Sequence, residues 1–331
     1  MSIEVFKVED DDDDIRLDRW FKRHHPALSQ VALQKALRKK DVKVNGKKVE
    51  PKHHVMAGDE IAVKPFVLEQ AVKQRASDPK THKPESRPLT EQQIQETKWM
   101  VMEQTKDAIL LNKPAGLAVQ GGSGIKDSID ARLYALRDEQ GNRPKLTHRL
   151  DKDTSGVLLL ARNAKSAARY AKAFSSKQTT KVYWALVMGS PEIREGTIDL
   201  PLDKQQGGAG ERMVVTEKGK RALTHYRVID ALGENMSWVE LMPVTGRTHQ
   251  LRVHMMEIGH PIVGDGKYGG REAFPSNTAL RLPKQLHLHA RRLIMPGEFD
   301  HIAPLPPHMV ETWKLLGLSK DDEGYSLADR E

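Results

Sequence analysis

The segment His148–Gly156 reads HRLDKDTSG and runs directly into the apolar segment Val157–Ala161, which reads VLLLA. The apolar segment predicts a buried strand, so the polar segment in front of it is a loop fixed at the edge of a sheet. Such loops often carry catalytic side chains, because a rigid scaffold holds them in place. An aspartate in a turn also commonly accepts backbone hydrogen bonds, so Asp151 has both a catalytic and a structural interpretation.

Composition limits the class of protein. The chain has 331 residues, of which 38% are hydrophobic, so it can form two domains or one large domain with an appendage. It has no cysteine, which excludes disulfides, thiolate nucleophiles and cysteine-ligated zinc. Its net charge of +8 favours a polyanionic partner. Because no apolar stretch reaches the roughly 18 residues of a transmembrane helix and the N-terminus lacks a signal-peptide core, we expect a cytoplasmic protein without membrane contact.

The charge of the N-terminal region changes sign near residue 15. Residues 9–14 read EDDDDD, a block of like charges that predicts a solvated, disordered tail over residues 1–14. Between residues 15 and 75 there are 15 Lys and Arg against 6 Asp and Glu. The basic character of the chain is therefore concentrated in this second segment.

Residues 15–70 predict two short helices and a small sheet. Leu17 and Trp20 share one helical face, and Ser29 suits the N-cap of a second helix over Gln30–Lys39. The dipeptide Asn45-Gly46 lies between two short β-forming segments and predicts a hairpin with a type I′ turn. Another short strand follows.

This arrangement resembles the S-four RNA-binding module. The resemblance is carried by the segments Arg16–Trp20, Val44–Gly46 and Ala57–Asp59. It implies a small α/β domain over residues 15–70 that binds RNA through a basic face. The residues assigned to that face are Arg16, Arg19, Lys35, Arg38, Lys39 and Lys43. A solvated basic face without a ligand is the alternative.

A second, larger domain is expected over residues 98–317. Residues 71–97 contain three prolines and few apolar side chains, which predicts a linker. Apolar patterning then predicts a strand that begins at Ala108, a strand over Thr179–Met188 and a helix that contains Leu251. Residues 318–331 are acidic and predict a second disordered tail.

Two features of this domain raise the question of a cofactor or a metal. Gly121–Gly124 reads GGSG and lacks the Gly-x-x-x-x-Gly-Lys spacing of a nucleotide-phosphate loop. His287 and His289 share a strand face, as metal ligands do, but no third ligand at suitable spacing accompanies them. We therefore expect no metal, and we assign the two histidines a structural role.

Five segments occur in the order expected for RluA-type pseudouridine synthases. They are Leu111–Pro114, His148–Gly156, Lys181–Tyr183, Gly246–His254 and His260–Asp265. The chain resembles this family over roughly residues 98–317, and it looks closest to the RluC branch, which acts on large-subunit ribosomal RNA. The RluD branch and relatives that act on transfer RNA stay open. The resemblance implies an α+β fold with a mixed, largely antiparallel central sheet.

The resemblance also implies a reaction that needs neither cofactor nor metal, in which uridine loses its N1–C1′ bond, rotates and rejoins through C5. Asp151 starts it, by attack on the ribose or the base or by removal of a ribose proton. Arg252 keeps this carboxylate ionised, and Tyr183 packs against the flipped base. Arg149 fills the space that the base leaves in the RNA helix. The other side chains assigned to substrate RNA are His148, Thr154, Lys113, Arg247 and His249.

Two alternatives from other classes remain. An RNA-binding or ribosome-assembly protein that has lost its activity would have a damaged site, whereas all three implied catalytic residues are present. A hydrolase with Ser155 as nucleophile and His148 or His249 as base would need a Gly-x-Ser-x-Gly turn, and the first glycine is missing. We expect a monomeric enzyme that modifies RNA.

Overall fold

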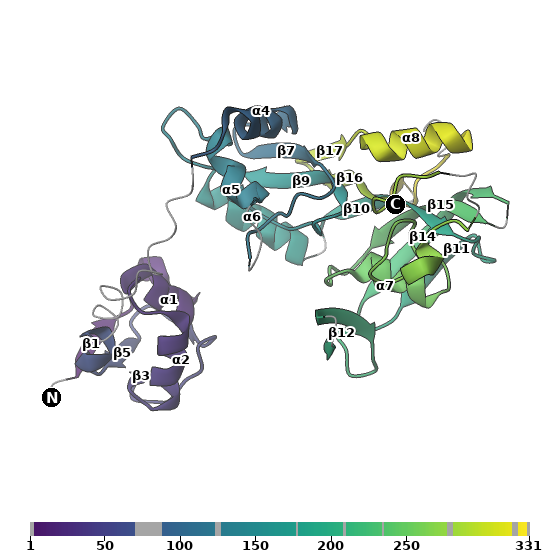
Figure 1. The fold of residues 1–331 in the computed structure, drawn as a ribbon. Coiled ribbons are helices and arrows are strands. Elements are labelled where there is room, and N and C mark those ends of the chain that lie inside the picture. Colours follow the sequence, from purple (N-terminus) through teal and green to yellow (C-terminus); the bar gives the residue numbers. More distant parts are fainter. Residues whose placement is uncertain are drawn as a thin grey trace. The chain divides into compact units, whose positions relative to one another are not determined.

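The computed structural model describes residues 3–69, 88–122, 127–176, 178–207, 210–233, 235–276, 281–319 and 324–329. The chain divides into two compact units, Met1–Arg87 and Pro88–Glu331 (Figure 1). Each unit has an apolar core of its own, so each is described by itself.

The first unit contains the two predicted helices, α1 (Leu17–His24) and α2 (Gln30–Arg38). Their apolar faces share a core with the antiparallel sheet β1-β5-β3, whose strands are Glu4–Lys7, Glu60–Val63 and Val42–Val44. A separate pair joins β2 (Ile15–Arg16) to β4 (His54–Val55). Ser29 caps α2 as predicted, because its hydroxyl accepts the backbone N–H of Ala32.

The predicted hairpin is right at its turn and wrong at its second strand. Asn45 and Gly46 both have positive φ, 47° and 73°, as a type I′ turn requires. Beyond the turn only Val44 and Lys47 form a bridge, and β3 pairs instead with β5. The Asn45 side chain explains this outcome, since it bonds the Asp59 carboxylate at 2.7 Å and accepts the next backbone N–H at 2.8 Å.

The acidic run is part of the first unit and not a disordered tail. Residues Asp10–Asp12 form a 3₁₀ turn behind β1, and Asp12 is buried against Arg23 and His24 of α1. Burial raises the pKa of Asp12, but the hydrogen bonds from His24 and Arg23 outweigh it and hold the pKa below its usual value. The expectation of disorder counted only like charges within the run and left out the cations that pack against it.

The second unit is built on a ten-stranded sheet, within the described residues, in the order β11-β14-β15-β10-β16-β9-β7-β6. β17 pairs with β16 and β8 with β9 beside this path. All its pairs are antiparallel except β9 with β16, so the predicted mixed, largely antiparallel sheet is confirmed. The strands are β6 (Val101–Gln104), β7 (Ala108–Lys113), β8 (Lys145–Leu146), β9 (Ser155–Ala161), β10 (Thr180–Met188), β11 (Glu195–Asp199), β14 (Leu223–Leu232), β15 (Met236–Pro243), β16 (Leu288–Met295) and β17 (Phe299–Ile302).

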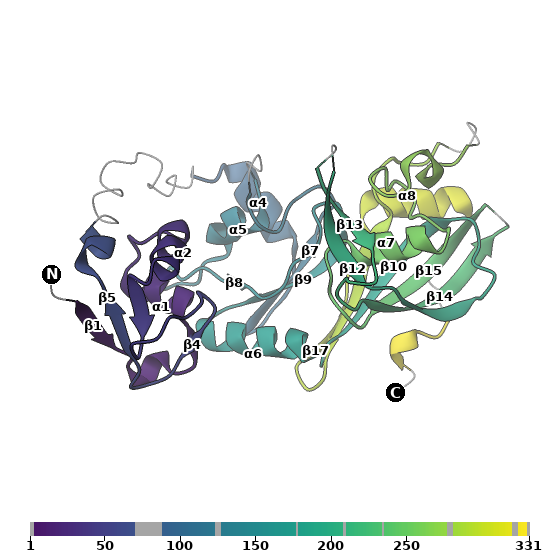
Figure 2. The same ribbon diagram turned by 90° about the horizontal axis from the view of Figure 1, so that it is seen from below.

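Helices cover both faces of this sheet (Figures 1 and 2). They are α4 (Glu91–Trp99), α5 (Ile129–Arg132), α6 (Ala164–Ser175), α7 (Gln250–Glu257) and α8 (Pro307–Leu316). Alternate residues of β10 belong to different cores: Trp184 packs with Trp313 of α8, and Tyr183 packs on the side of Leu251 of α7. A strand's side chains alternate between faces, so β10 directs Tyr183 to the α7 side. A separate hairpin, β12 (Leu202–Gly207) with β13 (Gly210–Val215), projects from the sheet.

The boundaries of the second unit differ from the predicted ones. Helix α4 begins at Glu91, where Thr90 and Gln93 form a capping box, so the unit starts before residue 98. The rest of the predicted linker, residues 71–87, lies outside the described residues. The segment His260–Asp265 is not a strand; within it only Ile262 forms a bridge, to Val187.

The predicted acidic C-terminal tail also has structure where it is described. Residues 324–329 contain a 3₁₀ turn with a buried Leu327. The Ser326 hydroxyl and the Leu327 N–H donate to the buried carboxylate of Glu240 on β15, at 2.9 and 2.6 Å. A buried carboxylate needs such donors, and this requirement fixes the segment on the sheet.

The one parallel pairing of the sheet lies directly after the Asp151 loop. β9 pairs along one side with β7, and its other side is shared by β16 at Ser155 and Gly156 and by β8 at Leu160 and Ala161. Gly156 has a φ of +111°, and a Cβ placed there would lie 2.2 Å from the carbonyl oxygen of Ala290. Only glycine allows the two strands to approach this closely.

We predict that Gly156→Ala lowers the free energy of unfolding of the second unit by at least about 3 kcal/mol, because strain at a positive φ adds to a backbone clash. Chemical denaturation followed by tryptophan fluorescence measures it. Gly141→Ala is the matched control, since Gly141 has a φ of +82° and nothing within 4 Å of an added Cβ; it should cost about 1–2 kcal/mol. Equal losses in the two variants would contradict the role given to the strand contact.

Candidate active site

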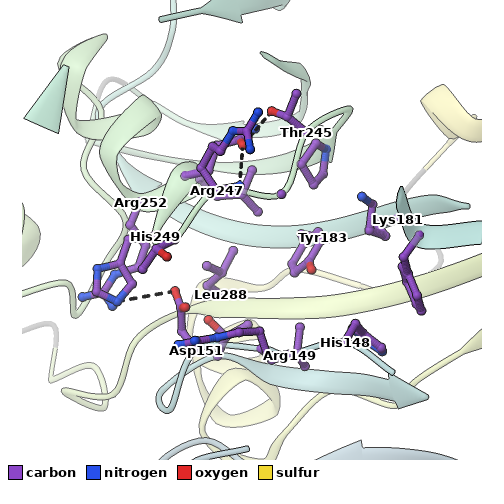
Figure 3. Close-up of a pocket in the computed structure, with 18 of the residues that line it drawn as sticks. His148, Arg149, Asp151, Lys181, Tyr183, Thr245, Arg247, His249, Arg252 and Leu288 are labelled. Atoms are coloured by element: carbon purple, nitrogen blue, oxygen red, sulfur yellow. Dashed lines mark hydrogen bonds and ion pairs between the residues drawn. The ribbon is translucent and has the colours of Figure 1, made fainter. Parts of the chain in front are cut away.

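A cavity of about 600 Å³ opens beside the Asp151 loop (Figure 3). The loop, the start of β10, the end of α6, the start of β16 and the segment between β15 and α7 all contribute to its wall. The three residues implied to be catalytic all line it. Its polar and charged lining residues include His148, Arg149, Asp151, Thr154, Lys181, Tyr183, Arg247, Thr248, His249 and Arg252.

The upstream end of the loop is fastened to β9 by two side chains. The Thr147 hydroxyl donates to the carbonyl of Leu159 at 2.7 Å, and His148 Nε2 accepts the Leu159 N–H at 2.9 Å. These side chains satisfy the backbone of β9 between its pairings with β8 and β16. Burial, helped by the charge of Lys181, lowers the pKa of His148 to about 3. His148 therefore bonds β9 with a neutral ring while it also forms part of the cavity wall, and its contact with RNA stays a prediction.

The downstream end is fastened by Lys113, which is completely buried. Its Nζ donates to the carbonyls of Pro114, Leu117 and Lys152 at 2.8, 2.8 and 2.9 Å. Burial lowers the pKa of Lys113 to about 7, although two nearby carboxylates act in the opposite direction. The predicted RNA contact of Lys113 is wrong, because all three of its donors are used inside the protein.

The turn at the tip of the loop and the strand start behind it are also internally satisfied. Thr154 is buried, and its N–H donates to the carbonyl of Asp151 at 3.2 Å, which closes the turn. Thr154 lines the cavity, but its main contribution is to the shape of the loop. Ser155 is completely buried with its hydroxyl 2.9 Å from His289 Nδ1. A buried hydroxyl cannot attack a substrate, so this geometry disfavours the hydrolase alternative.

The two histidines considered as metal ligands have structural partners. His287 contacts the Gln285 carbonyl and the Thr312 hydroxyl, each at 2.8 Å, and burial lowers its pKa to about 4. Burial likewise lowers the pKa of His289 to about 3. Within the described residues, no three histidine or carboxylate side chains gather in a way that suits a metal ion.

Asp151 and Tyr183 face the same space from the loop and from β10. The Asp151 side chain is 19% exposed, so the carboxylate is sheltered and still reachable. Tyr183 pairs in register with Leu241 of β15 and Ala290 of β16. Burial, followed by the negative charge of Asp151, raises the pKa of Tyr183 above its usual value. Its hydroxyl is therefore protonated near neutral pH.

Arg252 is held by the carboxylate of Asp265. Its Nε and Nη2 donate to the two oxygens of Asp265 at 2.8 and 2.7 Å, a bidentate pair. Burial lowers the pKa of Arg252, but Asp265 and the charge of Asp151 raise it above its usual value. Arg252 and Asp151 line one cavity and lie within electrostatic range of each other, so the role of Arg252 in keeping Asp151 ionised stays a prediction.

Sequence reasoning gave no role to Asp265 or to Tyr268. Asp265 was visible as the last residue of a segment that carries the family resemblance, but nothing in its spacing connects it to Arg252. The ring of Tyr268 lies 5.1 Å from the guanidinium carbon of Arg252, and its hydroxyl is 2.7 Å from His249 Nδ1. No sequence signal points to Tyr268.

Two further residues assigned to RNA lie just before α7. Arg247 is exposed at the cavity rim, where its Nε donates to the Arg221 carbonyl at 3.0 Å. His249 has a left-handed backbone conformation, and its Nε2 lies 3.9 Å from Asp151 Oδ2. His249 therefore faces the carboxylate as well as the cavity.

The residues of the first unit that were assigned to RNA are exposed with one exception. Arg16 is half-buried and pairs with Asp18 through two hydrogen bonds, and its contact with RNA stays a prediction. The exposed residues are Arg19, Lys35, Arg38, Lys39 and Lys43.

No helix in the described part of either unit has the length and apolar character needed to cross a membrane.

Comparisons with known proteins agree with this architecture. The family model described as RNA pseudouridylate synthase matches residues 107–257, and that of the S4 domain matches residues 15–61. The ribosomal large subunit pseudouridine synthase C of Rickettsia felis is 38% identical over 286 residues, covering 85% of this chain and 88% of the relative. That of Vibrio cholerae is 33% identical over 314 residues, covering 93% and 95%.

A solved structure gives the same result. Human RNA Pseudouridylate Synthase Domain Containing 4 superposes with a TM-score of 0.57 at 28% identity, covering 69% of this chain and 98% of that one. The resemblance inferred from the five segments is thereby confirmed. The chain belongs to the family of RNA pseudouridine synthases and carries an S4 domain ahead of its catalytic domain.

Proposed function

We propose that the protein isomerises specific uridines of large-subunit ribosomal RNA to pseudouridine, with Asp151 as the residue that starts the reaction. The observation that carries the proposal is the convergence of Asp151, Tyr183 and Arg252 on one cavity. The names of the relatives from Rickettsia felis and Vibrio cholerae support ribosomal RNA as the target class.

The reaction is an isomerisation whose atoms balance without a second substrate. The N1–C1′ bond of uridine breaks, the uracil ring rotates, and a C5–C1′ bond forms. The proton on C5 is then lost and N1 gains one. Asp151 can begin this sequence by attack on the sugar or the base, or by taking a ribose proton. Each route needs an ionised carboxylate that is sheltered from bulk water, as the partly exposed Asp151 is.

The other groups on the wall of the cavity position the base and the RNA. Tyr183 offers its ring to the flipped uracil and its hydroxyl for proton transfer at C5. Extrusion of a stacked uridine costs a few kcal/mol, and the exposed guanidinium of Arg149 beside Asp151 can stack in the space it leaves. Arg252, held by Asp265, supplies positive charge near Asp151 without a direct bond to it.

The S4 domain supplies affinity for RNA in this proposal. Three exposed cations, Lys35, Arg38 and Lys39, lie at the end of α2. Such cations bind phosphates without sequence preference and release counterions when they do so. Recognition of particular uridines then falls to the catalytic domain and to the shape of the RNA.

To test the function, the purified protein is incubated with unmodified large-subunit ribosomal RNA and, separately, with unmodified transfer RNA, and pseudouridine is mapped in both. Modification of discrete uridines in ribosomal RNA supports the proposal. Modification of transfer RNA alone would show that the substrate is transfer RNA and not ribosomal RNA. Binding without modification of either RNA would favour the alternative of a catalytically inactive RNA-binding or ribosome-assembly protein.

We predict that Asp151→Asn lowers kcat for pseudouridine formation by about 10⁴-fold or more, because the residue that starts the reaction loses its charge. The matched control is Asp153→Asn, two residues along the same loop, where the side chain is exposed and outside the cavity. The control should keep activity within about threefold, within the range of exposed-site effects. Equal activity of the two variants would remove Asp151 from its role.

We also predict that neutralising Lys35, Arg38 and Lys39 together to Gln weakens RNA binding and lowers the magnitude of the slope of log affinity against log salt by about 2. Filter binding across a salt series measures this slope. The rate with saturating RNA should not change, since the substitutions lie in the other unit. An unchanged slope would contradict the assignment of α2 to the RNA backbone.

A further inference from the structure

We propose that His249 is a positioning residue for Asp151: its neutral imidazole directs Nε2–H at the carboxylate, in a tautomer that the Tyr268 hydroxyl selects. This proposal rests on the proposed function, because it assigns a task within the same site. It replaces the predicted role of His249 as an RNA contact.

The backbone of His249 aims the ring at Asp151. His249 has φ 52° and ψ 20°, in the left-handed region, immediately before α7. Residues other than glycine adopt this region rarely, and where they do the surrounding structure must hold them there. The ring of His249 projects beside Asp151 in Figure 3, where a dashed line marks the contact of Nε2 with Oδ2 at 3.9 Å. This distance suits a contact that shortens when substrate fills the site.

The hydrogen bonds of Tyr268 fix which ring nitrogen carries the proton. The Tyr268 oxygen accepts the Met213 N–H at 3.3 Å and lies 2.7 Å from His249 Nδ1. Within the described residues, these are the hydrogen bonds made by that hydroxyl. Tyr268 is buried, and among the described residues Nδ1 is the one acceptor within reach of its hydroxyl proton. We therefore assign that proton to the bond with Nδ1, which leaves the imidazole proton on Nε2.

Tyr268 itself is held in place by charged neighbours. The guanidinium carbons of Arg252 and Arg212 lie 5.1 and 4.9 Å from the centre of its ring. Its N–H donates at 3.2 Å to Asp265 Oδ1, the same oxygen that accepts from Arg252. A continuous network thus runs from Arg252 through Asp265 and Tyr268 to His249, and the ion-pair contact found for Asp151 in the described structure is with that histidine.

Burial favours the neutral form of His249, because it lowers the pKa of the imidazole below its usual value. Asp151 and Asp265 act to raise it, Arg252 and Lys267 act to lower it, and Glu211 also lies within electrostatic range. A neutral imidazole donates from one nitrogen only, so the tautomer decides whether Asp151 faces a donor or a lone pair. A donor aimed at a carboxylate favours its charged form and lowers its pKa.

The test compares His249→Leu, His249→Gln and Tyr268→Phe with wild type, using tritium release from C5 of uridine-labelled ribosomal RNA. His249→Leu should lower kcat about 100-fold with little change in KM and move the acid limb of the kcat profile to higher pH. Tyr268→Phe should shift the same limb and lower kcat about 10-fold, on the scale of lost supporting contacts. His249→Gln retains a donor and should restore most of the activity and the wild-type limb.

His225→Leu is the control, since His225 contacts Thr197 and lies outside the cavity; it should leave every parameter unchanged. Circular dichroism establishes that each variant is folded. The proposal would be overturned if the acid limb of the kcat profile stayed in place in both His249→Leu and Tyr268→Phe. A change in KM alone in His249→Leu would also overturn it, and would indicate that His249 binds RNA.

A readout without substrate separates this proposal from the function on which it rests. The imidazole nitrogens of His249, followed by NMR in ¹⁵N-labelled protein, should show a protonated Nε2 and an unprotonated Nδ1 in wild type, and this preference should be lost in Tyr268→Phe. A wild-type protein that makes no pseudouridine would contradict the proposed function without affecting this measurement. A proton on Nδ1 in the wild-type protein would overturn the positioning role even in an active enzyme.

Discussion

The contact between β9 and β16 at Gly156 and Ala290 is the constraint on which the site depends. The two strands run parallel only there, and the missing side chain of Gly156 allows the approach. This pairing sets where the chain must leave the sheet, and the Asp151 loop is the segment that leaves it. Upstream, Thr147 and His148 take over the hydrogen bonding of β9 where no strand continues. Downstream, the buried Lys113 donates a hydrogen bond to the loop carbonyl of Lys152.

This anchoring divides the residues of the loop into two kinds. Ser155 and Thr154 are buried, and His148 uses its ring acceptor on the backbone of β9. Arg149 and Asp151 present their charged groups to the cavity. Residues that stand together in one segment therefore have different tasks: bonds such as those of His148 and Ser155 hold the loop in place, and a rigid loop allows one carboxylate to be placed accurately.

Local pattern allowed many of the elements to be predicted, whereas the residues of the site came from the resemblance to a family. The apolar run after Gly156, the alternation through Tyr183 and the cap at Ser29 each specify structure within a few residues. Pairings between distant segments were not accessible in this way. The partners of the buried Asp12 are 11 and 12 residues away, and the donors to Glu240 are more than 80 residues away. Charge patterns along the chain predicted disorder in both places because they do not include these partners.

The same limit explains why Asp265 was missed. The family resemblance connected Arg252 with Asp151, but two carboxylates lie near this one guanidinium. Asp265 binds the guanidinium because it accepts from both Nε and Nη2 in a buried, bidentate geometry. The carboxylate of Asp151 lies on a more exposed loop and makes no such bidentate pair in the described structure. In the proposed mechanism, an arginine held by Asp265 supplies positive charge near Asp151 through space and leaves the Asp151 carboxylate oxygens open to the substrate.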